Sequence, residues 1–131
     1  MPIEYTRFPP DLAARYRARG YWIDQPLTRA LDAQVMANPD AVAVIDGPRQ
    51  LTYAQIAHQA TQLADRLRQR GLGPGDRAVV QLPNCAEFVI VFHALLRAGI
   101  APVNAIFSHR ALEMASYVAQ LRPAVLIGDH S

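Results

Sequence analysis

Histidine and cysteine side chains often do chemistry in enzymes, and this sequence has few of them. The four histidines, His58, His93, His109 and His130, are scattered without metal-ligand spacing and without partnering cysteines. We interpret His58, which has polar neighbours in a predicted helix, as a surface residue. His93 falls in an apolar helix and is interpreted as a buried histidine with satisfied hydrogen bonds. The histidines therefore predict no metal site.

The single cysteine, Cys85, excludes an internal disulfide and a cysteine-rich metal site, and it fits a reducing compartment. It stands at the start of a predicted helix, where the helix dipole favours a reactive thiolate. The alternative is a small residue that serves packing, and we favour that interpretation.

His109 is the histidine of greatest interest because of what precedes it. Phe107 and Ser108 follow the carboxyl end of a predicted strand, and open parallel sheets bind ligands at that edge. Two roles are open for His109: a structural role at the start of the next helix, which we slightly favour, or direct contact with a substrate. Phe107, Ser108 and His109 are the candidate site residues of the sequence.

The densest glycine cluster, residues 71–75, does not have the context of a phosphate-binding loop. It follows a predicted helix and precedes a predicted strand, whereas a phosphate loop follows a strand and presents helix-terminal N–H groups to the anion. Walker spacing, a nucleophile elbow and a carboxylate pair are also absent from the sequence. This disfavours a small, complete nucleotide-binding protein.

The elements that must position these residues alternate between strand and helix. Short helices are predicted after Pro9-Pro10 and after Pro26, and together they form a helical lead-in over residues 1–40. Four apolar runs then predict buried strands, at residues 41–45, 78–82, 100–106 and 124–128. A short partner strand at residues 50–53 could follow the first of these.

Capping residues predict where the intervening helices begin. Thr52 and Gln55 have the spacing of a capping box, and so do Asn84 and Glu87. Ser108 could cap a further helix that runs to Leu121.

This alternation predicts an α/β fold with a mostly parallel sheet flanked by helices. The last strand is predicted to end three residues before Ser131, so nothing in the sequence covers it. We therefore expect an incomplete amino-terminal part of a larger domain. An uncovered face and an unpaired strand edge would favour self-association, and a monodisperse, cooperatively unfolding monomer would count against this expectation.

Composition limits the possible partners. The 131 residues are 51% hydrophobic and 18% charged, which is sufficient for one compact domain. The net charge of +2 is spread along the chain rather than gathered into a basic patch, so a nucleic-acid partner is not expected. No signal peptide and no apolar segment of membrane-spanning length are visible, and we expect a cytoplasmic protein.

Several local segments together resemble one family. Those segments are Thr6-Arg7-Phe8-Pro9, Gly20-Tyr21-Trp22, Leu51-Thr52-Tyr53, Val80-Gln81-Leu82-Pro83-Asn84, the run from Ala94 to Val103, and Ala105-Ile106-Phe107-Ser108-His109-Arg110. The chain, from Ile3 to Gly128, resembles the amino-terminal part of the large domain of adenylate-forming ligases. Within that superfamily it is most similar to the aryl-acid branch, the 2,3-dihydroxybenzoate–AMP ligases of siderophore biosynthesis.

The resemblance implies a parent enzyme that activates an aromatic acid with ATP and Mg²⁺ and passes it to an aryl carrier protein. The acid would be 2,3-dihydroxybenzoate or, as the less favoured choice, salicylate. The family's Ser/Thr/Gly-rich phosphate loop is absent here, and its catalytic lysine cannot be present because all 13 basic residues are arginine. We therefore expect residues 41–131 to be the start of the adenylation domain, inactive alone and unable to bind ATP or Mg²⁺ well.

The resemblance also gives the candidate residues a role. Phe107, Ser108 and His109 would form a wall of the acyl or pantetheine channel. The alternative function is a non-catalytic binding or assembly module that uses the same fold segment to contact a carrier protein or another chain.

Overall fold

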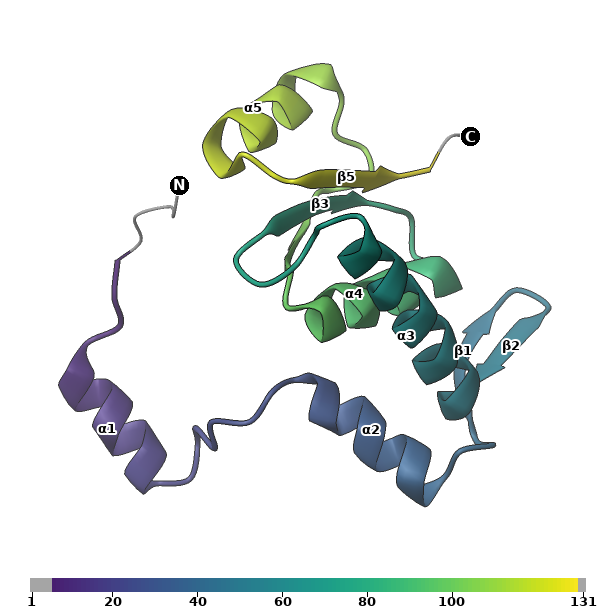
Figure 1. Cartoon of the computed structure of the whole chain (residues 1–131), viewed down its shortest axis with the longest axis horizontal. Helices are drawn as coiled ribbons and strands as arrows, with labels where there is room; N and C mark the ends of the chain where they lie inside the picture. Colours follow the sequence, from purple (N-terminus) through teal and green to yellow (C-terminus); the bar gives the residue numbers. More distant parts are fainter. Residues whose placement is uncertain (1–5, 130–131) are drawn as a thin grey trace.

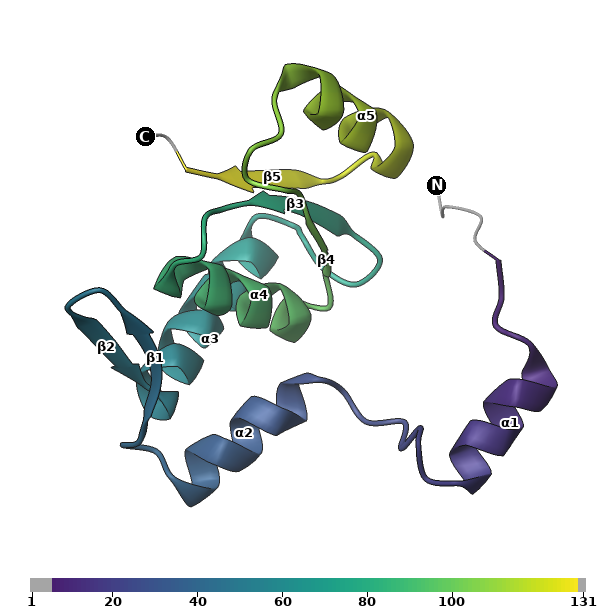
Figure 2. The same cartoon turned by 180° about the vertical axis from the view of Figure 1, so that it is seen from behind.

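The computed structural model describes residues 6–129, and a three-stranded parallel sheet in the order β4–β3–β5 lies at its centre. The strands are β3 (Arg77–Gln81), β4 (Ala101–Asn104) and β5 (Val125–Gly128). Helices α3 (Tyr53–Gln69) and α4 (Ala86–Ala98) pack together on one side of the sheet, and α5 (Ala111–Leu121) lies on the other (Figures 1 and 2). The predicted α/β class is confirmed.

Both helices predicted in the lead-in are present. Helix α1 (Pro10–Ala18) buries no residue and stands apart from the sheet (Figures 1 and 2). Its Tyr16 ring lies against Phe8 and Trp22, with centroid distances of 5.8 and 5.6 Å. Helix α2 (Thr28–Ala37) does reach the core, because Leu31 is buried with residues of α3 and α4.

The first predicted strand and its short partner strand, predicted at residues 50–53, are both present, but the first strand was assigned to the wrong sheet. Residues 41–45 were expected to form a buried strand of the parallel sheet, but β1 (Val42–Asp46) pairs antiparallel with β2 (Arg49–Thr52) in a separate hairpin. Ile45 is 70% exposed. A short apolar run does not show which sheet its strand joins, and the two-residue turn at Gly47-Pro48 favours local antiparallel pairing with the following strand.

The main core lies between α3, α4 and one face of the sheet. Ala60 and Ala64 of α3 and Ala94 of α4 have no exposed surface, and such small residues allow the two helices to approach closely. Leu95 of α4 is also fully buried, among apolar residues of both helices and of β3. This packing explains why α4 is apolar on most of its circumference.

The predicted cap of α3 is confirmed, but that of α4 is wrong. Thr52 Oγ1 accepts from the Gln55 N–H at 3.2 Å, and Gln55 Oε1 accepts from the Thr52 N–H at 2.9 Å. Asn84 does not cap α4, because that helix begins at Ala86, whose N–H donates to Asp46 Oδ2 at 3.0 Å. The hairpin therefore supplies the cap, a long-range contact that residue spacing cannot indicate.

The second half of the predicted α4 cap also has another role. Glu87 was expected to complete a capping box, but its carboxylate pairs with the guanidinium of Arg49 on β2. That bond, made to the charged carboxylate, lowers the pKa of Glu87 below its ordinary value. The start of α4 is thus fastened to the hairpin by Asp46 and by Arg49.

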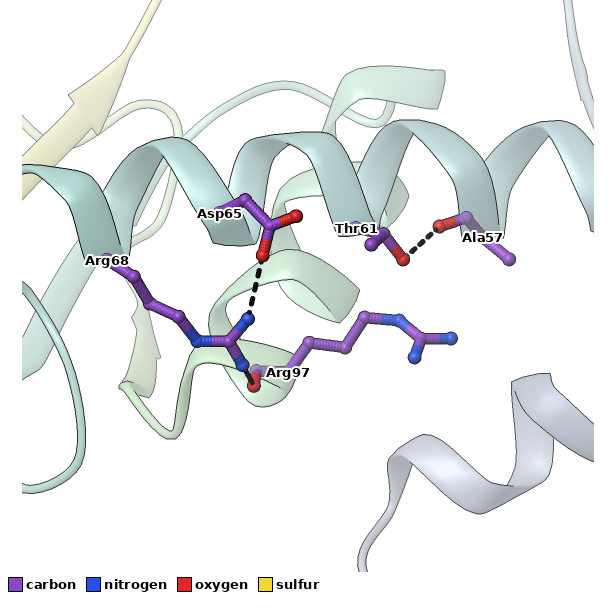
Figure 3. A network of polar contacts seen from close by, with 5 residues as sticks. All are labelled: Ala57, Thr61, Asp65, Arg68 and Arg97. Atoms are coloured by element: carbon purple, nitrogen blue, oxygen red, sulfur yellow. Dashed lines mark hydrogen bonds and ion pairs between the residues drawn. The ribbon is translucent and has the colours of Figure 1, made fainter.

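A polar network connects the carboxyl-terminal ends of α3 and α4 (Figure 3). The Arg68 guanidinium donates to Asp65 Oδ1 at 3.0 Å and to the carbonyl oxygen of Arg97. The side chain of Arg97 extends away from this contact and pairs with Asp32 of α2. Arg68 and Arg97 therefore connect α3, α4 and α2 through polar contacts.

The opposite face of the sheet is less covered. Val79 of β3 is in register with Val103 and Leu126, so the three side chains share the face away from α3 and α4. Leu126 is 55% exposed, and α5 buries none of its residues. This open face is the basis for self-association, which stays a prediction.

Gly99, which ends α4, is expected to tolerate alanine less well than Gly71, which follows α3. Both are left-handed, with φ of 78° and 81°, which costs alanine about 1–2 kcal/mol. A Cβ on Gly99 would also lie 3.0 Å from Pro74 Cγ and 3.3 Å from Pro74 Cα, whereas one on Gly71 would meet open space. We expect Gly99→Ala to lower the unfolding free energy by about 2–4 kcal/mol and Gly71→Ala by about 1–2 kcal/mol.

Urea denaturation of the two variants measures this difference. Equal losses of stability would mean that Pro74 does not approach Gly99 as described.

Candidate functional site

The candidate site is the edge of the sheet where β3 and β4 end. Strand β4 ends at Asn104, two residues earlier than predicted, so residues 105–110 form a loop before α5. One hollow of about 450 Å³ lies on the α4 side of this loop and is lined by Leu82, Pro83, Asn84, Phe88, Asn104, Ala105, Ile106 and Phe107. A second, of about 420 Å³, is lined by Gln81, Phe107, Arg110 and Asp129.

Phe107 lines both hollows and is 48% exposed. One hollow is mostly apolar, and the other carries an amide, a guanidinium and a carboxylate. A flat aromatic side chain between them offers a face on which a planar ring could stack. Of the three predicted site residues, Phe107 has the position best suited to contact a ligand at this edge.

Ser108 is exposed within the turn that the His109 N–H closes by donating to the Ile106 carbonyl at 3.0 Å. It does not cap α5, because that helix begins three residues later, at Ala111. The helix start is satisfied instead by Glu113 Oε2, which accepts from the Arg110 N–H at 3.0 Å. This bond to the backbone lowers the pKa of Glu113 below its ordinary value.

His109 faces α5 rather than the two hollows beside Phe107. Its Nδ1 lies 3.3 Å from the Tyr117 hydroxyl, and both rings line a smaller hollow of about 220 Å³ on the helix. The structure therefore separates His109 from Phe107, although the two are close in sequence. The contact with Tyr117 favours the structural role of His109 at the start of α5, while substrate contact stays a prediction.

Gln81, which was predicted only as part of a strand, contacts the same loop. Its Nε2 donates to the carbonyl oxygens of Ile106, Phe107 and His109, at 3.2, 3.4 and 2.9 Å. Arg110 also donates to the carbonyls of Phe107 and His109. The polar type of Gln81, at the carboxyl end of an otherwise apolar strand, could have indicated a role at this edge. The spacing of residues in the sequence could not have indicated which carbonyl groups it contacts.

The remaining histidines agree only partly with their predictions. His58 is exposed on α3, as predicted. His93 was expected to have satisfied hydrogen bonds, but its buried Nδ1 has no partner. Burial, and secondarily the charge of Arg97, lowers the pKa of His93 below its ordinary value, so the ring is neutral at pH 7. His130 lies outside the described residues.

Within residues 6–129, no three histidine, cysteine, aspartate or glutamate side chains gather closely enough to hold a metal ion. Cys85 is half-buried and precedes α4 without a side-chain capping bond. In the same range, no helix is long and apolar enough to cross a membrane.

The sequence and the fold match a class of known proteins. The model of the AMP-binding enzyme family matches residues 31–131, and the chain therefore belongs to this family. Among curated proteins, it is 54% identical to pseudomonine synthase PmsE of Pseudomonas entomophila, over 98% of this chain and 21% of that protein. It is 40% identical to the vibriobactin-specific 2,3-dihydroxybenzoate-AMP ligase of Vibrio cholerae, over 87% of this chain and 21% of that ligase.

A solved structure shows the same arrangement. The apo structure of Mycobacterium smegmatis MbtA superposes with a TM-score of 0.89 and 40% sequence identity, over 93% of this chain and 23% of MbtA. The match thus includes most of the lead-in as well as the sheet. This chain spans only about a fifth to a quarter of the length of each of these three proteins.

Proposed function

We propose that this chain is the amino-terminal section of a ligase that adenylates an aromatic acid and transfers the acyl group to an aryl carrier protein in siderophore biosynthesis. The observation that carries the proposal is the match to the AMP-binding family over residues 31–131. The name of the Vibrio cholerae relative supports 2,3-dihydroxybenzoate as the acid, with salicylate as the less favoured choice.

We propose that the chain has two parts. Residues 1–40 are the helical lead-in, and residues 41–131 are the start of the adenylation domain. Phe107 is proposed to form a wall of the acyl or pantetheine channel, because it stands between an apolar and a polar hollow. Ser108 and His109 extend the same loop, and we keep them as weaker candidates for that wall.

We propose that this chain does not bind ATP and Mg²⁺ well by itself. The glycine cluster at 71–75 is a turn between α3 and β3, in which Asp76 accepts from the Gly73 N–H at 2.8 Å, so its backbone is not free to surround a phosphate. Within residues 6–129, no cluster of three potential metal ligands is present either. We propose that nucleotide and metal binding depend on other parts of the ligase, since this chain spans only 21% of the Vibrio cholerae relative.

A second candidate function is a binding or assembly module without catalysis. Leu112 of α5 and Leu126 of β5 are 82% and 55% exposed, which favours contact of these two elements with another polypeptide. The same exposure is expected of a ligase section whose other parts would cover it. We propose a cytoplasmic location in either case, because the lone Cys85 suits a reducing compartment.

Pyrophosphate exchange separates these possibilities. The isolated chain is expected to show no exchange of pyrophosphate into ATP with 2,3-dihydroxybenzoate or salicylate, because its sequence has no Ser/Thr/Gly-rich phosphate loop and no lysine. The two candidate functions differ for a hybrid ligase, in which this chain replaces the aligned section of the Vibrio cholerae enzyme. A ligase section should give a hybrid that catalyses exchange, whereas a non-catalytic module should not. Aromatic-acid-dependent exchange by the isolated chain would contradict the proposal.

A further inference from the structure

The central strand β3 holds both ends of the segment that crosses from β4 to β5. At its start, Arg77 Nε donates to the Leu121 carbonyl at 2.6 Å, and Nη2 donates to the Arg122 carbonyl at 3.3 Å. At its end, Gln81 donates to the loop that leads into α5. Side chains four positions apart on one strand point to the same face, so both reach the side on which α5 lies.

The loop at 106–109 has little else to fix it to the sheet. Backbone pairing between β3 and the following residues ends where the Ala105 N–H donates to the Val80 carbonyl at 2.8 Å. Ile106 and Phe107 are 60% and 48% exposed, and α5 buries no residue. Apolar packing therefore contributes little here, and polar contacts decide where the loop lies.

The chemistry of these contacts requires a donor at position 81. Carbonyl oxygens only accept hydrogen bonds, so three of them around one amide must face its nitrogen rather than its oxygen. The amide supplies two N–H groups, which the three carbonyls share. A side chain of the same shape without N–H groups would leave these carbonyls without this partner.

We propose that Gln81 is the positioning residue for the loop at 106–109, which it holds so that Phe107 stands between the two hollows. The consequence for substrate binding rests on the function proposed above, but the positioning itself does not. Gln81 acts through the loop backbone and need not touch a substrate.

Amide hydrogen exchange in the isolated chain tests the positioning. Gln81→Met, which has no donor, is expected to raise exchange of the His109 N–H by about tenfold, because the turn opens more often. Exchange of the Ala105 N–H, which reports the end of the sheet, is expected to stay unchanged. Equal His109 exchange in both proteins would overturn the proposal, and so would an equal rise at both amides, which would indicate a loosened sheet.

Gln81→Glu is the matched variant of unchanged shape. At pH 7 its carboxylate accepts hydrogen bonds but donates none, and it faces the same three carbonyls. We therefore expect at least the rise in His109 exchange seen with Gln81→Met. Exchange at the wild-type rate in Gln81→Glu would show that shape, not donation, fixes the loop, and the proposal would fail.

Kinetics of the hybrid ligase separate this inference from the proposed function. Gln81→Met in the hybrid is expected to raise KM for the aromatic acid about five- to tenfold while kcat changes less than twofold, because binding loses a positioned wall. A rise in His109 exchange without any change in KM would leave Gln81 as the positioning residue and remove Phe107 from the channel.

Discussion

Replacing Leu95 by alanine is expected to lower the free energy of unfolding by about 2–5 kcal/mol, which is a large part of the stability of a small domain. Leu95 has no exposed surface and lies in the cluster that joins α3, α4 and the sheet. Shortening it removes buried apolar contacts and leaves a cavity. Its neighbours include Ala60, Ala64 and Ala94, whose short side chains cannot move to fill that cavity.

Leu112→Ala is the matched control, because this leucine of α5 is 82% exposed. We expect it to change stability by no more than about 0.5 kcal/mol. The measurement is the urea midpoint of the wild-type chain, Leu95→Ala and Leu112→Ala, with unfolding monitored by far-ultraviolet circular dichroism. Complete unfolding of Leu95→Ala would agree with the prediction, whereas similar midpoints for the two variants would mean that the chain does not fold around this core.

Phe107→Ala in the hybrid ligase is expected to lower kcat/KM for 2,3-dihydroxybenzoate about tenfold, because one aromatic wall of the proposed channel is lost. Phe107 is half-exposed between two hollows, so its truncation removes ligand contacts without opening the core. The protein should therefore remain folded, and the loss should appear chiefly in KM.

Two histidine variants accompany this experiment. His109→Ala should impair the hybrid if His109 contributes to the channel, whereas unchanged adenylation and thiolation kinetics would leave it with the structural role suggested by Tyr117. His58→Ala, on the exposed face of α3, should leave the kinetics unchanged. Wild-type kinetics of Phe107→Ala would exclude the proposed wall.

Local features of the fold could be predicted because neighbouring residues determine them. The Thr52–Gln55 capping box follows from a three-residue spacing, and the left-handed end of α4 follows from Gly99. The strand at 124–128 follows from its apolar run. These interactions involve a few successive residues, so a single sequence contains the information that specifies them.

Long-range choices could not be predicted in the same way. The run at 41–45 identifies a strand, and its short partner at 50–53 was predicted, but the run does not show that this hairpin stays separate from the parallel sheet. Asn84 and Ser108 are plausible caps by residue type, but Asp46 and Glu113 satisfy the helix starts instead. Of these, Asp46 is 40 positions away from the N–H that it accepts from, so only the fold brings the two together.

In the candidate site, too, local features could be predicted and long-range contacts could not. The sequence placed residues 107–109 at the carboxyl edge of the sheet, and Phe107 lies there between two hollows. It did not indicate that His109 faces α5, nor that Gln81 contacts the loop. Both depend on how the crossover lies over the sheet, which distant contacts such as that of Arg77 with Leu121 help to fix.

The exchange of pyrophosphate into ATP by the hybrid ligase tests the central claim most directly. The claim is that this chain is the amino-terminal section of an aromatic-acid adenylating ligase. If it is correct, the folded hybrid catalyses exchange that depends on 2,3-dihydroxybenzoate, while neither this chain nor the truncated Vibrio cholerae enzyme does so alone. A hybrid that folds as a stable monomeric unit and shows no acid-dependent exchange would contradict the claim.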